Sequence, residues 1–243
     1  TQGVSSAASD VYKRQDWVFM NVFSAIILGA GSGDRMGGID KILTEISGVP
    51  AILHSVNAFI EVGIFQTTIL LANTDNIDEL KRLMSDPKYQ SVHVVLGGNR
   101  RQDSVRIGLD QIKSSDYVMI HDGARPCVSP DLIRRGMMAS ENSDAAIPVV
   151  PITDTVKMLK DSMVMSTMDR SSLYASQTPQ VFKYKTIAEL HLTLTSDVTD
   201  DAAIIEIHGG NVSTYDGDPE NIKMTNPIDI EIAETILKRR KGK

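Results

Sequence analysis

The chain has 243 residues, of which 42% are hydrophobic and 23% charged, and these ordinary globular proportions exclude collagen-like, disordered and low-complexity classes. Lys and Arg total 25 against 31 for Asp and Glu, so the net charge of −6 offers no basic surface for nucleic acid. The single cysteine, Cys127, excludes an internal disulfide and a cysteine-rich zinc site, and it favours a protein of the reducing cytoplasm.

The first residues have to be separated from the folded part of the chain. Residues 1–16 are polar and lack periodicity, whereas no residue from Trp17 to Gly33 is charged, as in the apolar region of a signal peptide. Polar residues and glycines interrupt this stretch, which falls short of the roughly 18 apolar residues that span a bilayer. We therefore expect residues 1–19 to be a disordered or non-native leader and residues 20–243 to be a single domain with no membrane partner.

Short apolar runs rich in β-branched residues then alternate with segments of helical periodicity. Strands are expected at Val22–Leu28, Thr67–Ala72, Val92–Leu96, Tyr117–His121 and Ala145–Val149. Helices are expected at Ala51–Glu61, Ile77–Met84, Gln102–Ile112 and Asp131–Ser140. This alternation predicts an α/β protein with a mostly parallel sheet flanked by helices, in which ligands bind at the carboxyl ends of the strands.

One segment, residues 152–176, departs from this alternation. Two strand-like stretches, Thr155–Met158 and Met163–Met165, flank a polar turn and predict a β-hairpin arm that projects from the sheet. Beyond the arm, helices are expected at Ile187–Leu194 and Ala202–His208, a strand at Val212–Tyr215, and a last helix opening near Pro227. The basic run 238–241 is expected to complement the dipole of that helix and to remain solvated.

A glycine loop follows the first strand and reads Gly29-Ala30-Gly31-Ser32-Gly33-Asp34-Arg35-Met36-Gly37-Gly38. It does not match the G-x-G-x-x-G dinucleotide fingerprint, and Ile39 stands where a P-loop requires Lys. The loop carries its own cations, Arg35 and Lys41, which suit the cleavage of a phosphoanhydride because negative charge grows on the phosphoryl oxygens. The alternative is a tight strand–helix turn with solvated charges.

Polar motifs also follow the third and fourth strands. Gly97–Val105 combines paired glycines with a helix start that can read a base edge, although it is equally an N-capped helix. After the fourth strand, Asp122 is well placed to hold Mg²⁺ against a triphosphate, and Arg125 offers a planar fork for a second phosphate. His121 is expected to be a structural neighbour, because it lacks other metal ligands at suitable spacing.

The sequence offers no nucleophile with an evident base. Ser32 lacks the G-x-S-x-G context, and Cys127 is expected to be a buried filler. The histidines form no H-x-H or H-E-x-x-H pattern that would bind zinc. This inventory favours direct attack of one substrate on another, with the protein supplying charge and position.

The glycine loop with Lys41 resembles the signature of the sugar-nucleotide pyrophosphorylase superfamily. Later motifs resemble one branch of it, the 2-C-methyl-D-erythritol 4-phosphate cytidylyltransferases of the non-mevalonate isoprenoid pathway. In order along residues 23–237, these motifs are Gly97-Gly98 through Arg101-Gln102-Asp103-Ser104-Val105, Gly108-Leu109, His121-Asp122-Gly123-Ala124-Arg125-Pro126, Asp169-Arg170-Ser171-Ser172-Leu173, Gln177-Thr178-Pro179-Gln180, Thr199-Asp200-Asp201-Ala202 and Asn221-Ile222-Lys223-Met224-Thr225.

The resemblance implies a Rossmann-like fold and a homodimer in which the arm is exchanged between subunits. It also implies a reaction in which CTP and methylerythritol phosphate give the cytidine-diphospho sugar alcohol and pyrophosphate, with Mg²⁺. By the resemblance, the catalytic residues are Arg35, Lys41, Lys223 and Asp122, which also binds the metal. The nucleotide-binding residues are Gly29, Ala30, Gly31, Gly33, Gly98, Asn99, Ser104 and Gly123, and the substrate-binding residues are Arg125, Thr155, Arg170, Thr178 and Thr199.

The chain departs from the family pattern in a few positions. Gly29 and Gly123 stand where the family usually has Ala, and Asp40-Lys41-Ile42 replaces the common Pro-Lys-Gln. The loop between Arg35 and Lys41 is also about one residue shorter. None of these changes removes a charged catalytic group, but they bear on the placement of Lys41 and on the stiffness of the loop.

Three alternatives remain open at this point. A cytidylyltransferase for another polyol phosphate, such as ribitol 5-phosphate, would share most of these motifs, but Ala124 before Arg125 replaces the valine typical of those enzymes. A nicotinamide-dependent oxidoreductase is disfavoured by the failed dinucleotide fingerprint. A non-catalytic nucleotide-binding regulator would not need Lys41 or Lys223.

Overall fold

A computed structural model describes residues 16–31, 40–194 and 197–242. Its strands are β1 (Phe23–Leu28), β2 (Glu45–Ile46), β3 (Val49–Pro50), β4 (Phe65–Ala72), β5 (Val92–Leu96), β6 (Tyr117–Asp122), β7 (Ala145–Pro151), β8 (Lys157–Lys160), β9 (Met163–Thr167), β10 (Tyr174–Ser176), β11 (Gln180–Lys183) and β12 (Val212–Asp216). Its α-helices are α2 (Ala51–Val62), α3 (Ile77–Leu83), α4 (Arg101–Asp110), α5 (Pro130–Ala139), α6 (Tyr184–Thr193), α7 (Ala202–Ile207) and α8 (Ile228–Lys241), and short 3₁₀ turns cover Pro87–Tyr89 and Arg170–Ser172.

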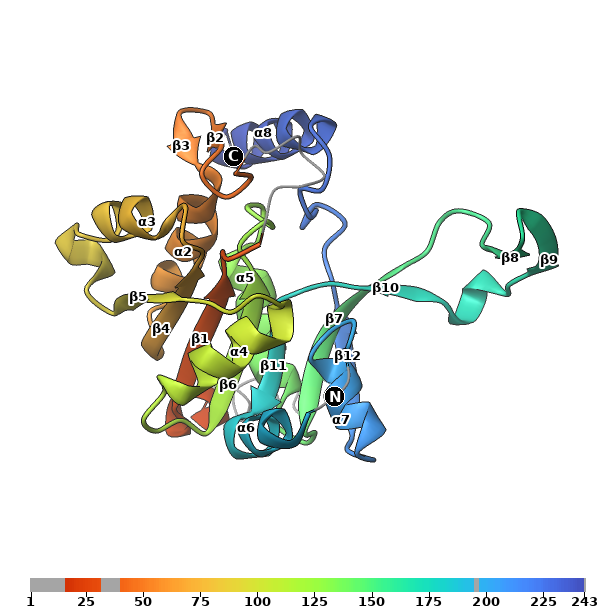
Figure 1. Cartoon of the computed structure of the whole chain (residues 1–243), viewed down its shortest axis with the longest axis horizontal. Coiled ribbons are helices and arrows are strands. Elements are labelled where there is room, and N and C mark those ends of the chain that lie inside the picture. Colours follow the sequence, from red (N-terminus) through yellow and green to blue (C-terminus); the bar gives the residue numbers. More distant parts are fainter. Residues whose placement is uncertain (1–15, 32–39, 195–196, 243) are drawn as a thin grey trace, which may run out of the picture.

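An eight-stranded sheet forms the centre of the molecule (Figure 1). Its order is β10-β7-β11-β6-β1-β4-β5, and β12 pairs in addition with β7. The pairs β6–β1, β1–β4, β4–β5 and β12–β7 are parallel, whereas β11 is antiparallel to both of its neighbours, as is β10 to β7. The predicted α/β class with a mostly parallel sheet is confirmed.

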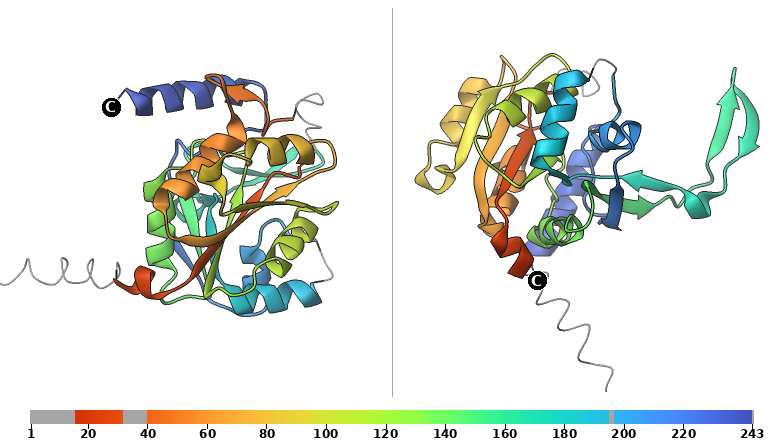
Figure 2. Two further views of the ribbon diagram at one scale, coloured as in Figure 1. Left: turned by 90° about the vertical axis from the view of Figure 1, so that its left-hand side faces the viewer. Right: turned by 90° about the horizontal axis from the view of Figure 1, so that it is seen from below.

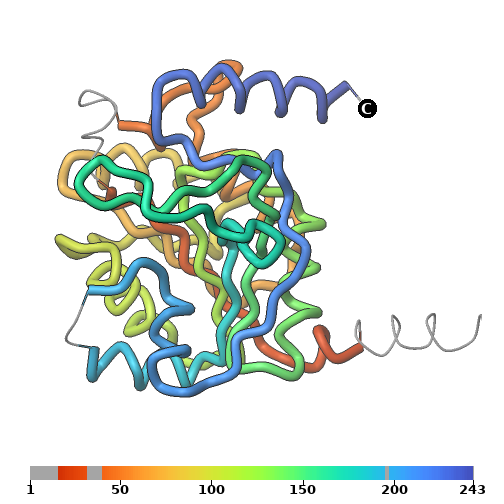
Figure 3. Tube along the Cα trace, turned by 90° about the vertical axis from the view of Figure 1, so that its right-hand side faces the viewer, coloured from red at the N-terminus to blue at the C-terminus, as the bar shows by residue number. Residues whose placement is uncertain are grey.

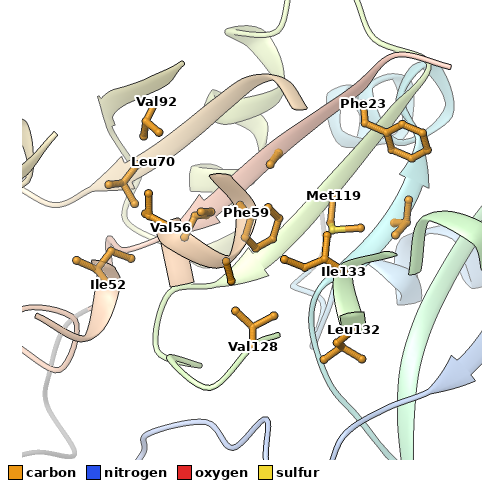
Figure 4. Packing of buried hydrophobic residues seen from close by; sticks show 14 of the residues in the cluster. Phe23, Ile52, Val56, Phe59, Leu70, Val92, Met119, Val128, Leu132 and Ile133 are labelled. Carbon is orange, nitrogen blue, oxygen red and sulfur yellow. The ribbon is translucent and has the colours of Figure 1, made fainter. Parts of the chain in front are cut away.

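The central strands bury both of their faces, with helices on each side. On one face, Phe23, Leu70 and Met119 pack against α2, α3 and α5, and Figure 4 shows Phe59 of α2 within this cluster. The adjacent strand residues point the other way: Ile26 packs with residues of α4, α6 and α7. Because successive strand residues face opposite sides, a strand covered on both faces is apolar throughout, which is why these runs lacked polar alternation.

Some elements were not predicted from the sequence. The strand β11 has only four residues and contains Gln180 and Lys183, so it carries no long apolar run. Its register is set by pairing with β6 and β7 rather than by its own composition. The two-residue strands β2 and β3 are likewise joined by a tight turn in which Ser47 and Gly48 have positive φ.

The predicted arm is present as the hairpin β8–β9, which projects from the body (Figures 1 and 2). Its two-residue turn, Asp161-Ser162, has φ values of 49° and 65°, the left-handed conformation that joins tightly paired antiparallel strands. Strand β8 begins and ends two residues later than the predicted Thr155–Met158, whereas β9 begins at the predicted Met163 and continues two residues beyond Met165. Every residue of β8 and β9 is exposed, including apolar Leu159 and Met163.

The two ends of the described chain both pack on the body. Residues 16–20 are helical, and the Trp17 ring lies 5.1 Å from that of Tyr117 and 6.0 Å from that of Phe23. The segment predicted as a leader therefore ends in residues that contact the sheet; residues 1–15 lie outside the described part. At the other end, the prediction that the whole run 238–241 is solvated was wrong, because Arg240 is 28% exposed and pairs with Asp218.

Candidate active site

A cleft of about 570 Å³ opens at the carboxyl ends of β1, β4, β5 and β6, where the topology predicts a ligand site. Loops from both sides of the sheet contribute to it. Its lining is made by Leu28, Ala30, Gly31, Lys41, Ile42, Asn73, Thr74, Leu96, Gly97, Gly98, Asn99, Arg100, Arg101, Ser104, Asp122, Ala124 and Lys223. Most of the residues predicted for catalysis and nucleotide binding are therefore brought together; Arg35 and Gly33 lie outside the described residues.

Where the glycine loop leaves β1, it lies in close contact with β4, the neighbouring strand in the sheet. Gly29 donates its N–H to the carbonyl of Leu71 at 2.8 Å, and a Cβ on Gly29 would lie only 2.8 Å from the same oxygen. The buried side chain of Asn76 then bridges the two ends of the loop, donating to the Gly29 carbonyl and to Asp40 Oδ2. In this chain the glycine permits a tight approach of the backbone, and Asn76 positions the segment that carries Lys41.

A second tight turn connects β5 to α4. The Gly98 N–H donates to the Ser104 hydroxyl at 3.1 Å, and Asp103 caps the helix by accepting from the Arg100 N–H. A Cβ on Gly98 would lie 2.5 Å from that of Asp103, so the turn closes directly over the helix start. The N-capped helix start is therefore confirmed, and the same turn lines the cleft, as recognition of a base edge would require.

Asp122, at the end of β6, is the electrostatic centre of the cleft. Its Oδ2 accepts from Lys223 Nζ at 2.8 Å, Arg101 Nε lies 3.5 Å from Oδ1, and Arg125 Nε lies 3.8 Å from Oδ2. Burial by itself would raise the pKa of the Asp122 carboxyl, but the charges of Arg101, Lys223 and Arg125 outweigh it and hold that pKa far below its ordinary value. The carboxylate is thus ionised throughout the physiological range.

Arg101 was not singled out from the sequence, although it belongs to the Gly97–Val105 motif. Besides Asp122, it binds the fully buried Asp201 at 2.7 Å, whose other oxygen lies 3.4 Å from His191 Nε2. The position of Arg101 shortly after the glycine pair Gly97-Gly98 was a signal in the sequence that could have marked it as a site residue. Its partner Asp201, 100 residues away in the chain, could be known only from the fold.

His121 and Thr178 lie beneath the cleft. Complete burial lowers the pKa of His121 to about 3, so the ring is neutral, and its two nitrogens contact the Thr178 hydroxyl and the Arg125 carbonyl. The Thr178 hydroxyl also accepts from the Asp122 N–H at 3.0 Å. His121 therefore has the structural position expected of it, and Thr178 supports the backbone of Asp122 rather than lining the cleft.

The side chain of Arg125 is largely buried, although the sequence predicted that it would be open to a substrate phosphate. Its side chain is 11% exposed, and Nη1 donates to the Asn221 carbonyl at 2.8 Å. Burial lowers the pKa of its guanidinium despite the neighbouring Asp122. Arg125 thus joins the loop that follows β6 to the loop that contains Lys223.

The remaining predicted residues lie outside the lining of the cleft. Thr155 and Arg170 are exposed on the arm segment, where Arg170 donates to the Thr153 carbonyl, and Thr199 is exposed ahead of α7. Gly123 lies behind the cleft, with its N–H donating to the Leu28 carbonyl at 2.9 Å. In its own chain, the arm therefore contributes nothing to the lining of the cleft.

A resident all-protein metal site is not present among the described residues, since no three His, Cys, Asp or Glu side chains gather there. The ionised Asp122 nevertheless suits Mg²⁺, which binds in many phosphoryl-transfer sites through one or two carboxylates together with substrate phosphates.

The fold and the cleft define a nucleotidyltransferase, and comparison with known proteins identifies the family. Residues 23–239 match the model of the 2-C-methyl-D-erythritol 4-phosphate cytidylyltransferases. The enzyme of that name from Clostridium beijerinckii is 39% identical over 222 residues, covering 88% of this chain and 98% of its own; that from Bacillus licheniformis is 35% identical over 224 residues, covering 90% and 97%. The chain belongs to this family.

A solved structure supports the same assignment. The 4-diphosphocytidyl-2C-methyl-D-erythritol synthase of Anaerococcus prevotii superposes with a TM-score of 0.79 at 30% identity, covering 90% of this chain and 99% of its own. The protein is thus a cytidylyltransferase of isoprenoid biosynthesis that uses CTP and methylerythritol phosphate. This assignment favours the methylerythritol phosphate enzyme over the three alternatives left open by the sequence: a ribitol phosphate enzyme, an oxidoreductase and a non-catalytic regulator. Within the described ranges, no helix has the length and apolarity needed to cross a membrane.

Proposed function

We propose that this chain catalyses direct in-line attack of the methylerythritol phosphate on the α-phosphorus of CTP. A substrate phosphate oxygen forms a bond to the α-phosphorus while the bond to the bridging oxygen breaks, and pyrophosphate leaves with the electron pair. The observation that carries this proposal is the convergence of Lys41, Lys223 and Asp122 on one cleft between two glycine turns. Because no nucleophile of the protein is needed, catalysis rests on position and charge.

The cations are proposed to act on the triphosphate. Arg35 and Lys41 would hold the phosphates and stabilise the charge that develops at the α-phosphorus, with Lys223 assisting. Gly29, Ala30, Gly31, Gly33, Gly98, Asn99, Ser104 and Gly123 are the proposed nucleotide-binding set. Of these, Ala30, Gly31, Gly98, Asn99 and Ser104 line the cleft, which supports their part in the proposal.

A divalent metal, Mg²⁺, is the proposed cofactor, with Asp122 as its protein ligand. When bound, the ion would neutralise phosphate charge and fix the orientation of the triphosphate. Asp122 is prepared for this by its low pKa, and Lys223 competes with the ion for Oδ2. Asp122 would hold the ion together with the phosphates of the nucleotide, because one carboxylate alone does not bind Mg²⁺ firmly.

The arm is proposed to be exchanged in a homodimer, so that Thr155 and Arg170 bind substrate in the partner's site. Arg125, Thr178 and Thr199 complete the proposed substrate-binding set, and Arg125 and Thr178 also contact Asp122. Exposed apolar residues on the arm support an interface, because Met158, Leu159, Met163, Val164 and Met165 are each more than half exposed in the single chain. The buried, unpaired thiol of Cys127 agrees with a proposed cytoplasmic location.

Pyrophosphate release tests the proposal directly. We expect purified protein to release pyrophosphate only when CTP, methylerythritol phosphate and Mg²⁺ are all present, and EDTA to stop the release. Ribitol 5-phosphate, offered with equal CTP, serves as the control substrate. Equal turnover of the two substrates would contradict the assignment, and turnover in EDTA would contradict the role of the metal.

A further inference from the structure

The last helix, α8, lies beyond the carboxyl end of the sheet and crosses the two loops that carry the charged residues of the cleft (Figures 1 and 3). Ala233 of α8 is buried with Cys127, which follows Asp122 in one loop, and with Met224, which follows Lys223 in the other. The Met224 N–H donates to the Ala124 carbonyl at 2.8 Å. The helix is therefore packed against the supports of both charged groups.

Arg240 connects the two loops from this helix. Its Nη2 donates to Asp218 Oδ2 at 2.9 Å and its Nε to Glu220 Oε2 at 3.1 Å, so the guanidinium forks over two carboxylates of the Lys223 loop. Its Nη1 donates to the Cys127 carbonyl at 2.5 Å in the Asp122 loop. A planar guanidinium presents five N–H donors from three nitrogens in a fixed arrangement and can reach all three acceptors, whereas the three donors of an ammonium all radiate from one nitrogen.

The contacts of Arg240 continue into the site through a short backbone path. Asp218 accepts from the N–H of Asn221 through its carbonyl at 2.9 Å, and Asn221 in turn anchors its own side chain on the Thr178 carbonyl at 2.7 Å. Two residues later, Lys223 meets Asp122. The segment 218–223, which leads from the contacts of Arg240 to Lys223, is thus held by hydrogen bonds at Asp218, Glu220 and Asn221.

We propose that Arg240 is a positioning residue for the transfer reaction, which holds Lys223 over Asp122 by joining the two loops from behind. Within the described part of the chain, its neighbours on α8 do not join the two loops: Arg239 pairs with Glu220, and Lys238 pairs with Glu234 of the same helix. The proposal rests on the role proposed above for Lys223. Displacing a catalytic group by about 1 Å can cost about 100-fold in rate, so a remote arginine can affect turnover strongly.

The test measures kcat and KM for Arg240→Gln, Lys223→Ala and the double variant, with Arg239→Gln as the matched control. We expect Arg240→Gln to lower kcat about 10-fold to 100-fold while the KM for CTP changes less, and Arg239→Gln to remain within about twofold of the parent. In the Lys223→Ala background, Arg240→Gln should lower kcat by no more than about twofold, because the group that it positions is already gone. Arg240→Lys, which keeps the charge without the fork, should fall between the parent and Arg240→Gln.

Thermal unfolding of each variant, with assays kept well below its midpoint, separates positioning from loss of fold. If Arg240→Gln does not fold, Arg240→Lys and its combination with Lys223→Ala provide the same comparison. A normal kcat in Arg240→Gln would overturn the proposal for Arg240 and leave the role of Lys223 intact. The same holds if Arg240→Gln lowers kcat as much in the Lys223→Ala background as in the parent. A normal kcat in Lys223→Ala would overturn the role of Lys223, and the inference with it.

Discussion

Lys223 and Asp122 lie 101 residues apart in the chain, and their side chains meet in a hydrogen bond of 2.8 Å. The ammonium is 38% exposed and the carboxylate only 11%, so the pair lies at the boundary between the interior and the cleft. If Asp122 holds Mg²⁺ as proposed, the ion would compete with Lys223 for the carboxylate, and the ammonium would then be available to a substrate phosphate. In the proposed mechanism, this pair would therefore link nucleotide binding to the placement of Lys223.

The cations of the cleft should matter for turnover far more than for folding. Lys41→Ala and Lys223→Ala should each lower kcat by roughly 10²–10³, the range seen when a preorganised donor to a developing negative charge is removed. The free energy of unfolding should be almost unchanged in Lys41→Ala, whose side chain lines an open cleft, and should fall by about 1–2 kcal/mol in Lys223→Ala, because Asp122 then loses one of the three cations around it. Steady-state kinetics with urea denaturation checks both, with exposed Lys185→Ala on α6 as control; a loss under tenfold would contradict the prediction.

The buried pair of Arg101 and Asp201 should give the protein a defined dependence on pH. Burial tends to raise the pKa of Asp201, but Arg101 and His191 outweigh it, and the pKa lies below the ordinary value of 3.8. A depressed pKa stabilises the fold above the unfolded value and loses that contribution as the pH falls through the folded value. We therefore expect the stability from Asp201 to persist from neutral pH down to about pH 4.

The substitution Arg101→Gln should reverse the direction in which the pKa of Asp201 is shifted. The unpaired carboxyl of Asp201 would then have a raised pKa, and the variant should lose about 3 kcal/mol at pH 7.5 but less at pH 5, where Asp201 takes up a proton. Urea denaturation at the two pH values measures the difference. Adding Asp201→Asn to Arg101→Gln should recover part of the lost free energy of unfolding and make the loss the same at the two pH values. If the single and the double variant lose the same free energy of unfolding, an ionised Asp201 is contradicted.

Exchange of the arm can be tested by mixing two inactive variants. Lys223→Ala damages the cleft and Arg170→Ala damages the arm, so an exchanged heterodimer combines both lesions in one site and leaves the other site intact. Denaturing and refolding the two variants together should restore about a quarter of the parental activity, as expected for random pairing. Each variant refolded alone is the control. Absence of recovery, with a dimer shown by light scattering, would mean that the arm does not serve the partner's site.

The boundary of the folded domain gives a further prediction. Deletion of residues 1–15 should leave kcat and the unfolding midpoint unchanged, whereas Trp17→Ala should cost about 2 kcal/mol, because the ring packs edge-on against Tyr117 and Phe23. Chemical denaturation of both proteins measures this. Phe19→Ala, at a side chain that is 76% exposed in the same segment, is the control and should be near neutral. A large loss on deleting residues 1–15 would refute the leader hypothesis.

Local sequence predicted the elements that depend on neighbouring residues. The apolar run of β1, the helical spacing in α2 and the polar turn at Asp161-Ser162 each act over a few residues, and all were identified. The short strand β11 was missed, because its place between β6 and β7 is decided by distant partners. The contacts of Arg240 were missed for the same reason, since its carboxylate partners precede it by about 20 residues and its carbonyl partner, Cys127, lies much further away in the chain.

By itself the sequence determined the chemistry available to this protein: a glycine loop with its own cations, a carboxylate at a strand end and no protein nucleophile. Only the tertiary structure decided which charges face one another. It placed Arg101, Arg125 and Lys223 around Asp122, buried Asp201 behind Arg101, and kept Thr155 and Arg170 away from the cleft of their own chain. The physical reason is that a charge acts over a few ångströms in space, whatever the separation along the chain, and only the packed sheet sets those distances.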